Sequence, residues 1–203
     1  MTEKELIDGL IVQNKAAIHY LVDSYQNNII KTAYYFVDNM EDAEDISQEV
    51  IMEILKSIGK YQKNSKLYAW IYRITVNRSL DHLRKQKRRS MVKRLESFIR
   101  ISSDGESRYS DEPATTDTQN DDNEKRKILD TSVNLLPGNQ KIAFILSKYD
   151  EMSYKEIADV MNLSLSSVES LIFRAKLNLQ KKLVNYFSEY STNNYQDGLF
   201  IRS

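Results

Sequence analysis

The stretch from Ser102 to Asn123 constrains this chain more than any other, because it contains almost no apolar residue. Serine, threonine, aspartate, asparagine and glutamine dominate it. Such a composition cannot bury enough apolar surface to offset the entropy lost when a backbone is ordered. We therefore expect a flexible acidic linker here and a separate hydrophobic core on each side of it.

Both flanking segments are predicted to be helical. Of 203 residues only five are glycine and two are proline, and alternation typical of strands is rare. The sequence therefore predicts an all-α protein of two small helical domains. The expected boundaries are a first domain over residues 1–100, the linker over 101–124, a second domain over 125–188, and a poorly ordered tail over 189–203.

Apolar residues at helical spacing predict where the helices and the core lie. The expected helices are two within 3–37, and then 42–58, 67–88, 127–135, 140–149, 154–161 and 165–187. The first-domain side chains predicted to face the core are Leu6, Leu10, Ala17, Leu21, Ile29, Ile30, Ala33, Tyr34, Val37, Ala43, Ile46, Val50, Ile54, Ile58, Trp70, Ile71, Ile74, Leu80 and Leu83.

Charges are sorted along the chain, although the formal net charge is zero. Residues 38–53 contain seven acids and no lysine or arginine, and residues 60–100 contain 13 basic residues against two acids. Residues 101–124 contain eight acids against one arginine. Blocks of opposite sign favour more than one kind of partner.

Membrane and disulfide-stabilised classes are disfavoured. Every apolar run is short and interrupted by polar residues, and the N-terminus lacks the basic and apolar pattern of a signal peptide. The chain has no cysteine, so no disulfide framework is possible. We expect a cytoplasmic protein that does not insert into membranes.

An aromatic-rich half adjoins a basic half between Leu67 and Arg89, in LYAWIYRITVNRSLDHLRKQKRR. Stacking surfaces beside a basic track are typical of proteins that capture unpaired bases. The basic residues also suit the C-terminal end of a solvated helix, so this alternative stays open.

The second domain contains a helix-turn-helix pattern in SYKEIADVMNLSLSSVESLIFRAKLNLQKKL. Ser153 and Glu156 form a capping box, Asn162 suits a left-handed turn, and Val168 and Leu171 are expected to face inward. An ordinary helical hairpin with a solvated outer face is the alternative. The outer-face residues that would enter the major groove of DNA are Ser166, Ser167, Glu169, Ser170, Phe173, Arg174 and Lys176.

Together these motifs resemble the extracytoplasmic-function group of bacterial RNA polymerase sigma factors, within the sigma-70 family. DAEDISQEV and YQKNSKLYAWIYRITVNRSLDHLRKQKR are similar to the polymerase-binding and minus-10 helices of that group. LPGNQKIAFIL and the helix-turn-helix are similar to its minus-35 domain. The resemblance covers most of residues 15–187. It implies a factor that binds core RNA polymerase and directs promoter-specific initiation, without enzymatic activity or a cofactor.

The resemblance also implies roles for individual residues. The clamp helices of the polymerase largest subunit would contact Asp45, Gln48, Glu49, Ile51 and Leu55. Minus-10 DNA would contact Tyr61, Lys63, Asn64, Arg73, Asn77, Arg78, Arg84, Lys85 and Arg88. The second domain would bind minus-35 DNA through the outer face given above, and would bind the polymerase flap. Whether an anti-sigma factor also binds the chain stays open.

Two other classes of function are compatible with parts of the sequence. A helix-turn-helix regulator would bind duplex DNA without being a polymerase subunit. A metal-dependent enzyme would use the carboxylates of residues 38–53. We expect no metal site, because these carboxylates lie along one helix with no histidine close by in sequence, and hard cations need oxygen ligands that converge on a point.

Overall fold

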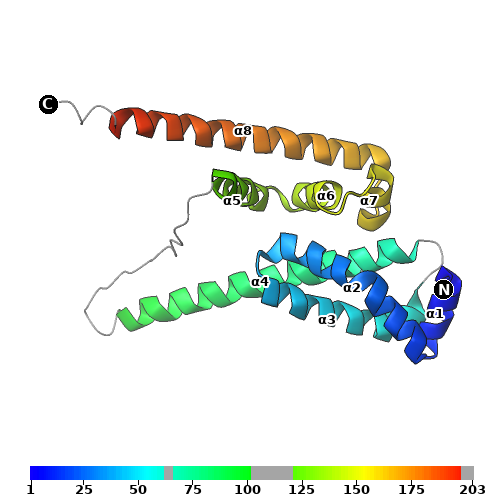
Figure 1. Ribbon diagram of the computed structural model, residues 1–203. Helices are drawn as coiled ribbons and strands as arrows, with labels where there is room; N and C mark the ends of the chain where they lie inside the picture. The colour runs from blue at the N-terminus through cyan, green and yellow to red at the C-terminus, as the bar shows by residue number, and fades with distance from the viewer. Residues whose placement is uncertain (62–65, 102–120, 198–203) are drawn as a thin grey trace. The chain divides into compact units, whose positions relative to one another are not determined.

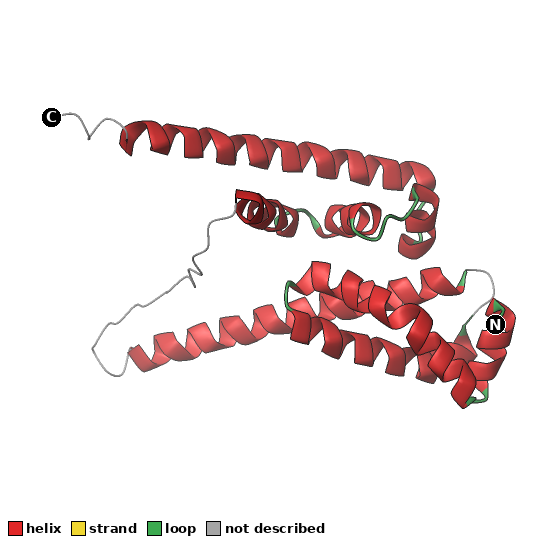
Figure 2. Ribbon diagram, in the orientation of Figure 1, coloured by secondary structure: helices red, strands yellow, loops and turns green. Residues whose placement is uncertain are grey.

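The chain folds into helices that form two compact units. The computed structural model describes residues 1–61, 66–101 and 121–197. Among these residues every regular element is a helix (Figure 2). Unit 1 comprises Met1–Thr118 and unit 2 comprises Gln119–Ser203. The prediction of an all-α fold is confirmed.

Three long helices build unit 1 around one core. Its elements are α1 (Glu3–Ile11), α2 (Lys15–Val37), α3 (Met40–Ser57), the 3₁₀-helix η1 (Ile58–Lys60) and α4 (Leu67–Ile101) (Figure 1). Helices α2, α3 and α4 contact one another, and α1 packs against α2 and η1. Figure 1 shows the second half of α4 extending beyond the ends of α2 and α3.

Side-chain caps fix where the first three helices begin. The backbone N–H of Glu5 donates to Oγ1 of Thr2 at 3.2 Å, and the backbone N–H of Thr2 donates to Oε2 of Glu5 at 2.8 Å. This capping box satisfies N–H groups that have no partner inside the helix. It also lowers the pKa of Glu5, because the hydrogen bonds from Thr2 favour its carboxylate. The side chains of Asn14 and Asn39 cap α2 and α3 by accepting from the backbone N–H groups of Ala16 and Asp42, at 2.8 and 2.9 Å respectively.

The core of unit 1 follows the predicted stripes closely. On α3 the residues Ala43, Ile46, Val50 and Ile54 are all fully buried, which confirms that prediction. On α1 and the first half of α2 the predicted residues Leu6, Leu10, Ala17 and Leu21 are buried as well. Six other predicted core residues are only half-buried, namely Ile30, Val37, Trp70, Ile74, Leu80 and Leu83.

One core prediction on α2 is wrong. Tyr34 has 39% of its side chain exposed, whereas Phe36 is 1% exposed. The inward stripe of this helix runs through Ile29, Ala33 and Phe36, at spacings of four and three residues. Tyr34 follows Ala33 directly and is therefore rotated about 100° away from the core.

Three helix ends differ from the sequence-based expectation. Helix α4 continues past Arg88 to Ile101, and α5 begins at Asp121, inside the predicted linker. Helix α8 continues past its predicted end at residue 187 to Asp197. In α4 and α8 no glycine or proline interrupts these extensions, so nothing in the sequence stops the helix.

A long helix organises unit 2. The elements are α5 (Asp121–Asn134), α6 (Gly138–Lys148), α7 (Tyr154–Met161) and α8 (Leu165–Asp197). Helix α8 contacts α5, α6 and α7, and lies alongside the first two (Figure 1). The buried hydrophobic residues between them are Val133, Leu136, Ile142, Ala143, Phe144, Ile145, Leu146, Ile157, Val160, Val168, Ile172, Ala175 and Leu179. No helix in the described part of the chain is long and apolar enough to cross a membrane.

Candidate nucleic-acid and protein interfaces

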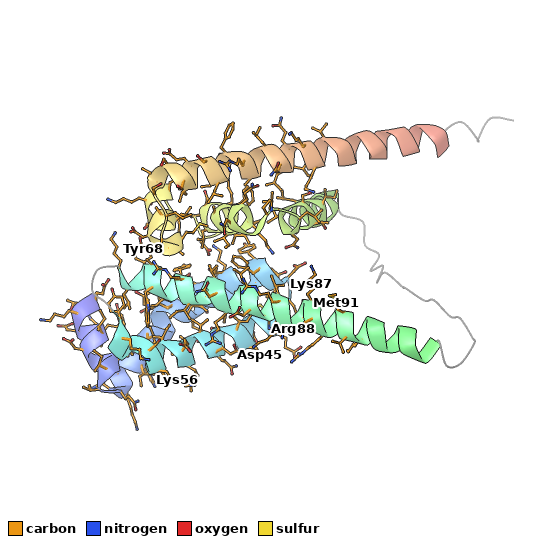
Figure 3. The ribbon with its side chains drawn as sticks, turned by 180° about the vertical axis from the view of Figure 1, so that it is seen from behind. Asp45, Lys56, Tyr68, Lys87, Arg88 and Met91 are labelled. Atoms are coloured by element: carbon orange, nitrogen blue, oxygen red, sulfur yellow. The ribbon has the colours of Figure 1, made fainter. Side chains whose placement is uncertain are left out.

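The outer side of α3 is an exposed acidic surface, which we call the acidic face. Its members are Glu41, Glu44, Asp45, Gln48, Glu49, Met52 and Lys56. The predicted contacts Asp45, Gln48 and Glu49 lie here together, and Figure 3 shows Asp45 and Lys56 along α3. The predicted contacts Ile51 and Leu55 are half-buried and pack against the core of unit 1, so they lie at the edge of this face.

Met52 is an apolar residue within the acidic face that the sequence-based assignment did not include. Its side chain is 53% exposed. Glu49 and Lys56 stand three residues before it and four residues after it, which puts all three on one side of the helix. The helical spacing could have identified Met52 as a contact residue, because exposed methionine is enriched in protein interfaces.

Arginine and histidine side chains of α4 contact carboxylates of α3. The guanidinium of Arg78 has its Nη2 at 2.8 Å from Oε2 of Glu53 and its Nη1 at 3.9 Å from Oε2 of Glu49. One helical turn later, Nε2 of His82 lies 3.3 Å from Oδ2 of Asp42. Arg78, predicted from the family resemblance to contact DNA, is therefore directed to α3. No pattern in the sequence predicts these pairs, because their members lie 25 or more residues apart.

The predicted minus-10 contacts on α4 form a surface that we call the basic track. Its members are Arg73, Asn77, Arg78, Arg84, Lys85 and Arg88. Asn77, Lys85 and Arg88 are exposed, whereas Arg73 is half-buried. Arg84 is 71% exposed and donates to Oδ1 of Asp81 at 2.8 Å. Figure 3 shows Lys87, Arg88 and Met91 on the part of α4 that extends from the helical bundle. Basic side chains therefore surround this part of the helix, where they are accessible to phosphate groups.

Packed side chains fix both ends of the loop that precedes α4. The ring of Tyr61 lies 5.4 Å from that of Trp70, and both pack against the core of unit 1. At the other end, the backbone N–H of Leu67 donates to Oε1 of Glu3, 3.4 Å away. Lys63 and Asn64, two of the predicted minus-10 contacts, lie outside the described residues.

Tyr25 of α2 is half-buried and packs against the core of unit 1. Burial raises the pKa of Tyr25, and the neighbouring carboxylate of Glu3 and the phenols of Tyr20 and Tyr61 raise it further.

The helix-turn-helix in unit 2 has the predicted geometry. Ser153 and Glu156 form the capping box at the start of α7, and Asn162 ends that helix with φ 54° and ψ 49°. The backbone N–H of Ser167 donates to Oγ of Ser164 at 3.2 Å, which caps the start of α8. Asparagine tolerates this left-handed backbone better than most residues, and this explains the tight turn between the two helices.

The inner side of α8 differs from the prediction at one position. Val168 is fully buried as predicted, but Leu171 is only half-buried. Ile172 occupies the inward position instead, with 2% of its side chain exposed. Ile172 is four residues after Val168 and continues the inward stripe of α8. Leu171 is three residues after Val168 and lies at the edge of that stripe.

The outer side of α8 holds most of the predicted duplex contacts. Phe173 is 64% exposed, and Ser166, Glu169, Ser170 and Arg174 are also exposed. Two hydroxyl groups are engaged inside the helix: Oγ of Ser170 donates to the carbonyl oxygen of Ser166 at 2.9 Å, and Oγ of Ser167 lies 2.8 Å from Oγ of Ser164. Ser167 is half-buried as a result of its place in the cap.

Lys176 is exposed on α8, three residues after Phe173 and seven after Glu169, at the edge of the outer side. It lines an apolar groove of about 500 Å³ together with Leu129 of α5 and Leu179, Gln180, Leu183 and Val184 of α8. Arg174 and Lys176 are two residues apart, so they point to opposite sides of the helix. Lys176 therefore lies on the side of the helix that carries Glu169 and Phe173, and away from Arg174.

Two family models match the chain, one in each unit. The model described as Sigma-70 region 2 matches residues 21–89. The model described as Sigma-70, region 4 matches residues 126–179. The matched segments contain α3 and the basic track in unit 1 and the helix-turn-helix in unit 2.

Characterised relatives are similar over most of their length. The ECF RNA polymerase sigma-E factor of Haemophilus influenzae is 29% identical over 189 residues, which cover 90% of this chain and 96% of that protein. The ECF RNA polymerase sigma factor SigW of Bacillus subtilis is 28% identical over 170 residues, or 80% of this chain and 87% of that protein. The RNA polymerase sigma-H factor of Pseudomonas aeruginosa is 26% identical over 186 residues, or 89% of this chain and 93% of that protein.

Solved structures have the same fold. CnrH, in its complex with the cytosolic domain of CnrY, superposes with a TM-score of 0.64 at 18% identity, covering 90% of this chain and 97% of that one. The sigma factor RpoE from Bartonella quintana, in its complex with the anti-sigma factor NepR, gives a TM-score of 0.55 at 19% identity, covering 81% and 95%. With both sigma-70 regions matched in order, and relatives of the same group aligned along most of the chain, this protein belongs to the extracytoplasmic-function group of the sigma-70 family, the RNA polymerase sigma factors that direct transcription to promoters.

Proposed function

We propose that the two units of this sigma factor bind core polymerase and the two promoter elements through different surfaces. The acidic face of α3 binds the clamp helices of core RNA polymerase. The basic track of α4 and the loop before it bind the minus-10 element, and the outer side of α8 binds the minus-35 element. The observation that carries this proposal is that opposite charges are exposed on adjacent helices of one unit.

The acidic face suits a contact with a basic protein surface. Asp45, Gln48 and Glu49 form a polar group around the exposed Met52. Apolar anchors with a polar rim are typical of protein interfaces. Complementary charge on the partner speeds association and excludes wrong partners.

The basic track suits DNA whose strands are separated. Its proposed phosphate contacts are Arg73, Arg84, Lys85 and Arg88, with Asn77 directed to bases or backbone. The loop from Tyr61 to Lys66 would receive an unpaired base, because stacking on aromatic groups stabilises such bases. Because phosphate contacts release counterions, binding should weaken steeply as salt increases.

The outer side of α8 suits a duplex. Short polar residues at its N-terminal end, with Arg174 further along, match the groups that read base edges in the major groove. Phe173 provides an apolar contact of the kind that thymine methyl groups accept. For Lys176 we propose a phosphate contact or a contact to the polymerase flap, since it lies at the groove between α5 and α8.

We further propose that this protein acts in the cytoplasm with RNA polymerase, has no enzymatic activity of its own, and is controlled by an anti-sigma factor. The support for such a partner comes from its structural neighbours. CnrH was solved with the cytosolic domain of CnrY, and RpoE with the anti-sigma factor NepR.

Double substitution of Asp45 and Glu49 by alanine tests the division of surfaces. We expect the affinity of the full chain for core polymerase to fall by about tenfold or more, since two interfacial charges are lost. Binding of the variant to a minus-35 duplex should stay unchanged. The double variant D8A/D23A removes two exposed acids outside the acidic face and serves as the control. An equal loss of both affinities in D45A/E49A would contradict the assignment.

A further inference from the structure

Arg78 is a predicted DNA contact whose charged group the structure directs to another helix. It follows the exposed Asn77 on α4, yet its side chain is only 35% exposed. The guanidinium lies between two carboxylates of α3, with Glu53 at 2.8 Å and Glu49 at 3.9 Å. Glu49 and Glu53 are four residues apart and so share one side of α3.

This arrangement neutralises Arg78 locally. The hydrogen bond from Nη2 to Glu53 joins two charged groups, which makes it stronger than a bond between neutral groups. The second carboxylate leaves the cluster with a net negative charge. A DNA phosphate approaching Arg78 would therefore meet a site that repels it, and would have to displace Glu53.

Arg84, Lys85 and Arg88 of α4 differ from Arg78 in this respect. Arg84 also pairs with an acid, Asp81, but its side chain is 71% exposed and that pair lies within one helix. Lys85 and Arg88 are exposed, and Figure 3 shows Arg88 on the part of α4 that extends from the helical bundle. These side chains are accessible to phosphate without breaking a contact between two helices.

We propose that Glu53 is a positioning residue that holds Arg78 against α3 and thereby masks its charge from DNA in the free chain. This inference rests on the proposed function, because it takes α4 as the surface that binds single-stranded DNA. We call the cluster of Arg78, Glu53 and Glu49 the mask. Glu49 also belongs to the acidic face, so the mask connects the proposed polymerase surface to the proposed DNA surface.

Binding of the full chain to a fluorescent 20-nucleotide oligo-dT at several salt concentrations tests the mask. The substitution E53A should strengthen binding by about threefold beyond any gain in E44A. E44A is the matched control, because Glu44 is an exposed acid of the same helix outside the cluster and its loss changes the net charge equally. The slope of log K against log salt should become steeper by about 0.7 in E53A, as expected for one more phosphate contact on a single strand.

If the mask exists, the stronger oligo-dT binding of E53A relative to E44A must depend on Arg78. R78A alone should change binding by less than about twofold, and E53A/R78A should exceed R78A by no more than E44A exceeds the wild type. Fluorescence of Trp70, the only tryptophan in the chain, reports whether unit 1 of each variant is folded. A gain of E53A over E44A that disappears in the double variant, with folded proteins throughout, would support the mask.

Two results would overturn it. One is an E53A variant that gains no more than E44A. The other is an R78A variant that loses as much binding as K85A, since Arg78 would then already contact DNA in the wild-type chain. Promoter-specific transcription with core polymerase tests the proposed function separately. A wild-type chain that is active in that assay, together with an E53A variant without a gain, refutes the mask alone.

Discussion

At the scale of single residues, Asn162 sets the turn of the helix-turn-helix. Its backbone is left-handed with φ 54°, and its N–H donates to the carbonyl oxygen of Ala158. In the left-handed conformation the Cβ atom of a residue lies too close to the following carbonyl oxygen. Asparagine tolerates this conformation better than most residues that have a Cβ atom. The orientation of α8 relative to α7 therefore depends on the backbone conformation that residue 162 can adopt.

Substitution of Asn162 by alanine should destabilise the turn. We expect the free energy of opening of α7 and α8 to fall by about 1 kcal/mol, because alanine lacks the local hydrogen bonding that favours the left-handed region. Hydrogen exchange of peptides from residues 154–175 measures this quantity. N162G should stay within about 0.5 kcal/mol of the wild type, since glycine adopts this backbone without strain. An N162A variant as protected as N162G would contradict the argument.

Residue roles could be predicted from the sequence where they depend on local geometry. The capping box of Ser153 and Glu156 and the turn at Asn162 are of this kind, because each involves neighbours within a few residues. The position of Arg78 could not be predicted in this way. Its partner Glu53 lies 25 residues away, and only the packing of α3 against α4 brings the two together.

At the scale of elements, the close approach of α1 to α2 depends on Gly9. A Cβ atom at this position would lie 2.7 Å from Cβ of Ala17, which is shorter than side chains tolerate. Ala17 is fully buried at the start of α2, and its Cβ is fixed by the backbone. The two helices would have to move apart to accommodate any side chain larger than hydrogen.

Substitution of Gly9 by alanine should therefore destabilise unit 1. Overpacking of this kind costs about 1–3 kcal/mol, even though alanine favours a helix more than glycine does. Urea unfolding followed through the fluorescence of Trp70 measures the stability of this unit. Gly59 offers a matched control, because nothing lies within 4 Å of the Cβ that G59A would add. A G9A variant at least as stable as G59A would show that the contact relaxes without cost.

Helices were predicted well where their apolar stripe is regular and less well where nothing marks an end. The stripe of α3 matched at Ala43, Ile46, Val50 and Ile54, because each turn contributes one inward side chain. Helices α4 and α8 continue past their predicted ends at residues 88 and 187, in stretches where polar residues are frequent but glycine and proline are absent. Polar residues are compatible with a solvated helix, whereas glycine and proline are not.

At the scale of the whole molecule, the order of charged and apolar segments predicted two helical units, and the structure confirms the all-α architecture. The sequence also predicted that acidic and basic surfaces are separate. It could not predict that Glu49 serves the acidic face and an ion pair to α4 at once. That arrangement arises from the tertiary packing of unit 1, which periodicity along one helix does not determine.

The most direct test of the central claim is run-off transcription with core RNA polymerase and the purified full chain. Templates would come from promoters mapped by the transcripts that increase when the chain is overproduced. The account predicts promoter-specific transcripts that require both core polymerase and the chain. A chain that binds these promoters as duplex DNA but gives no specific initiation with core polymerase would contradict it.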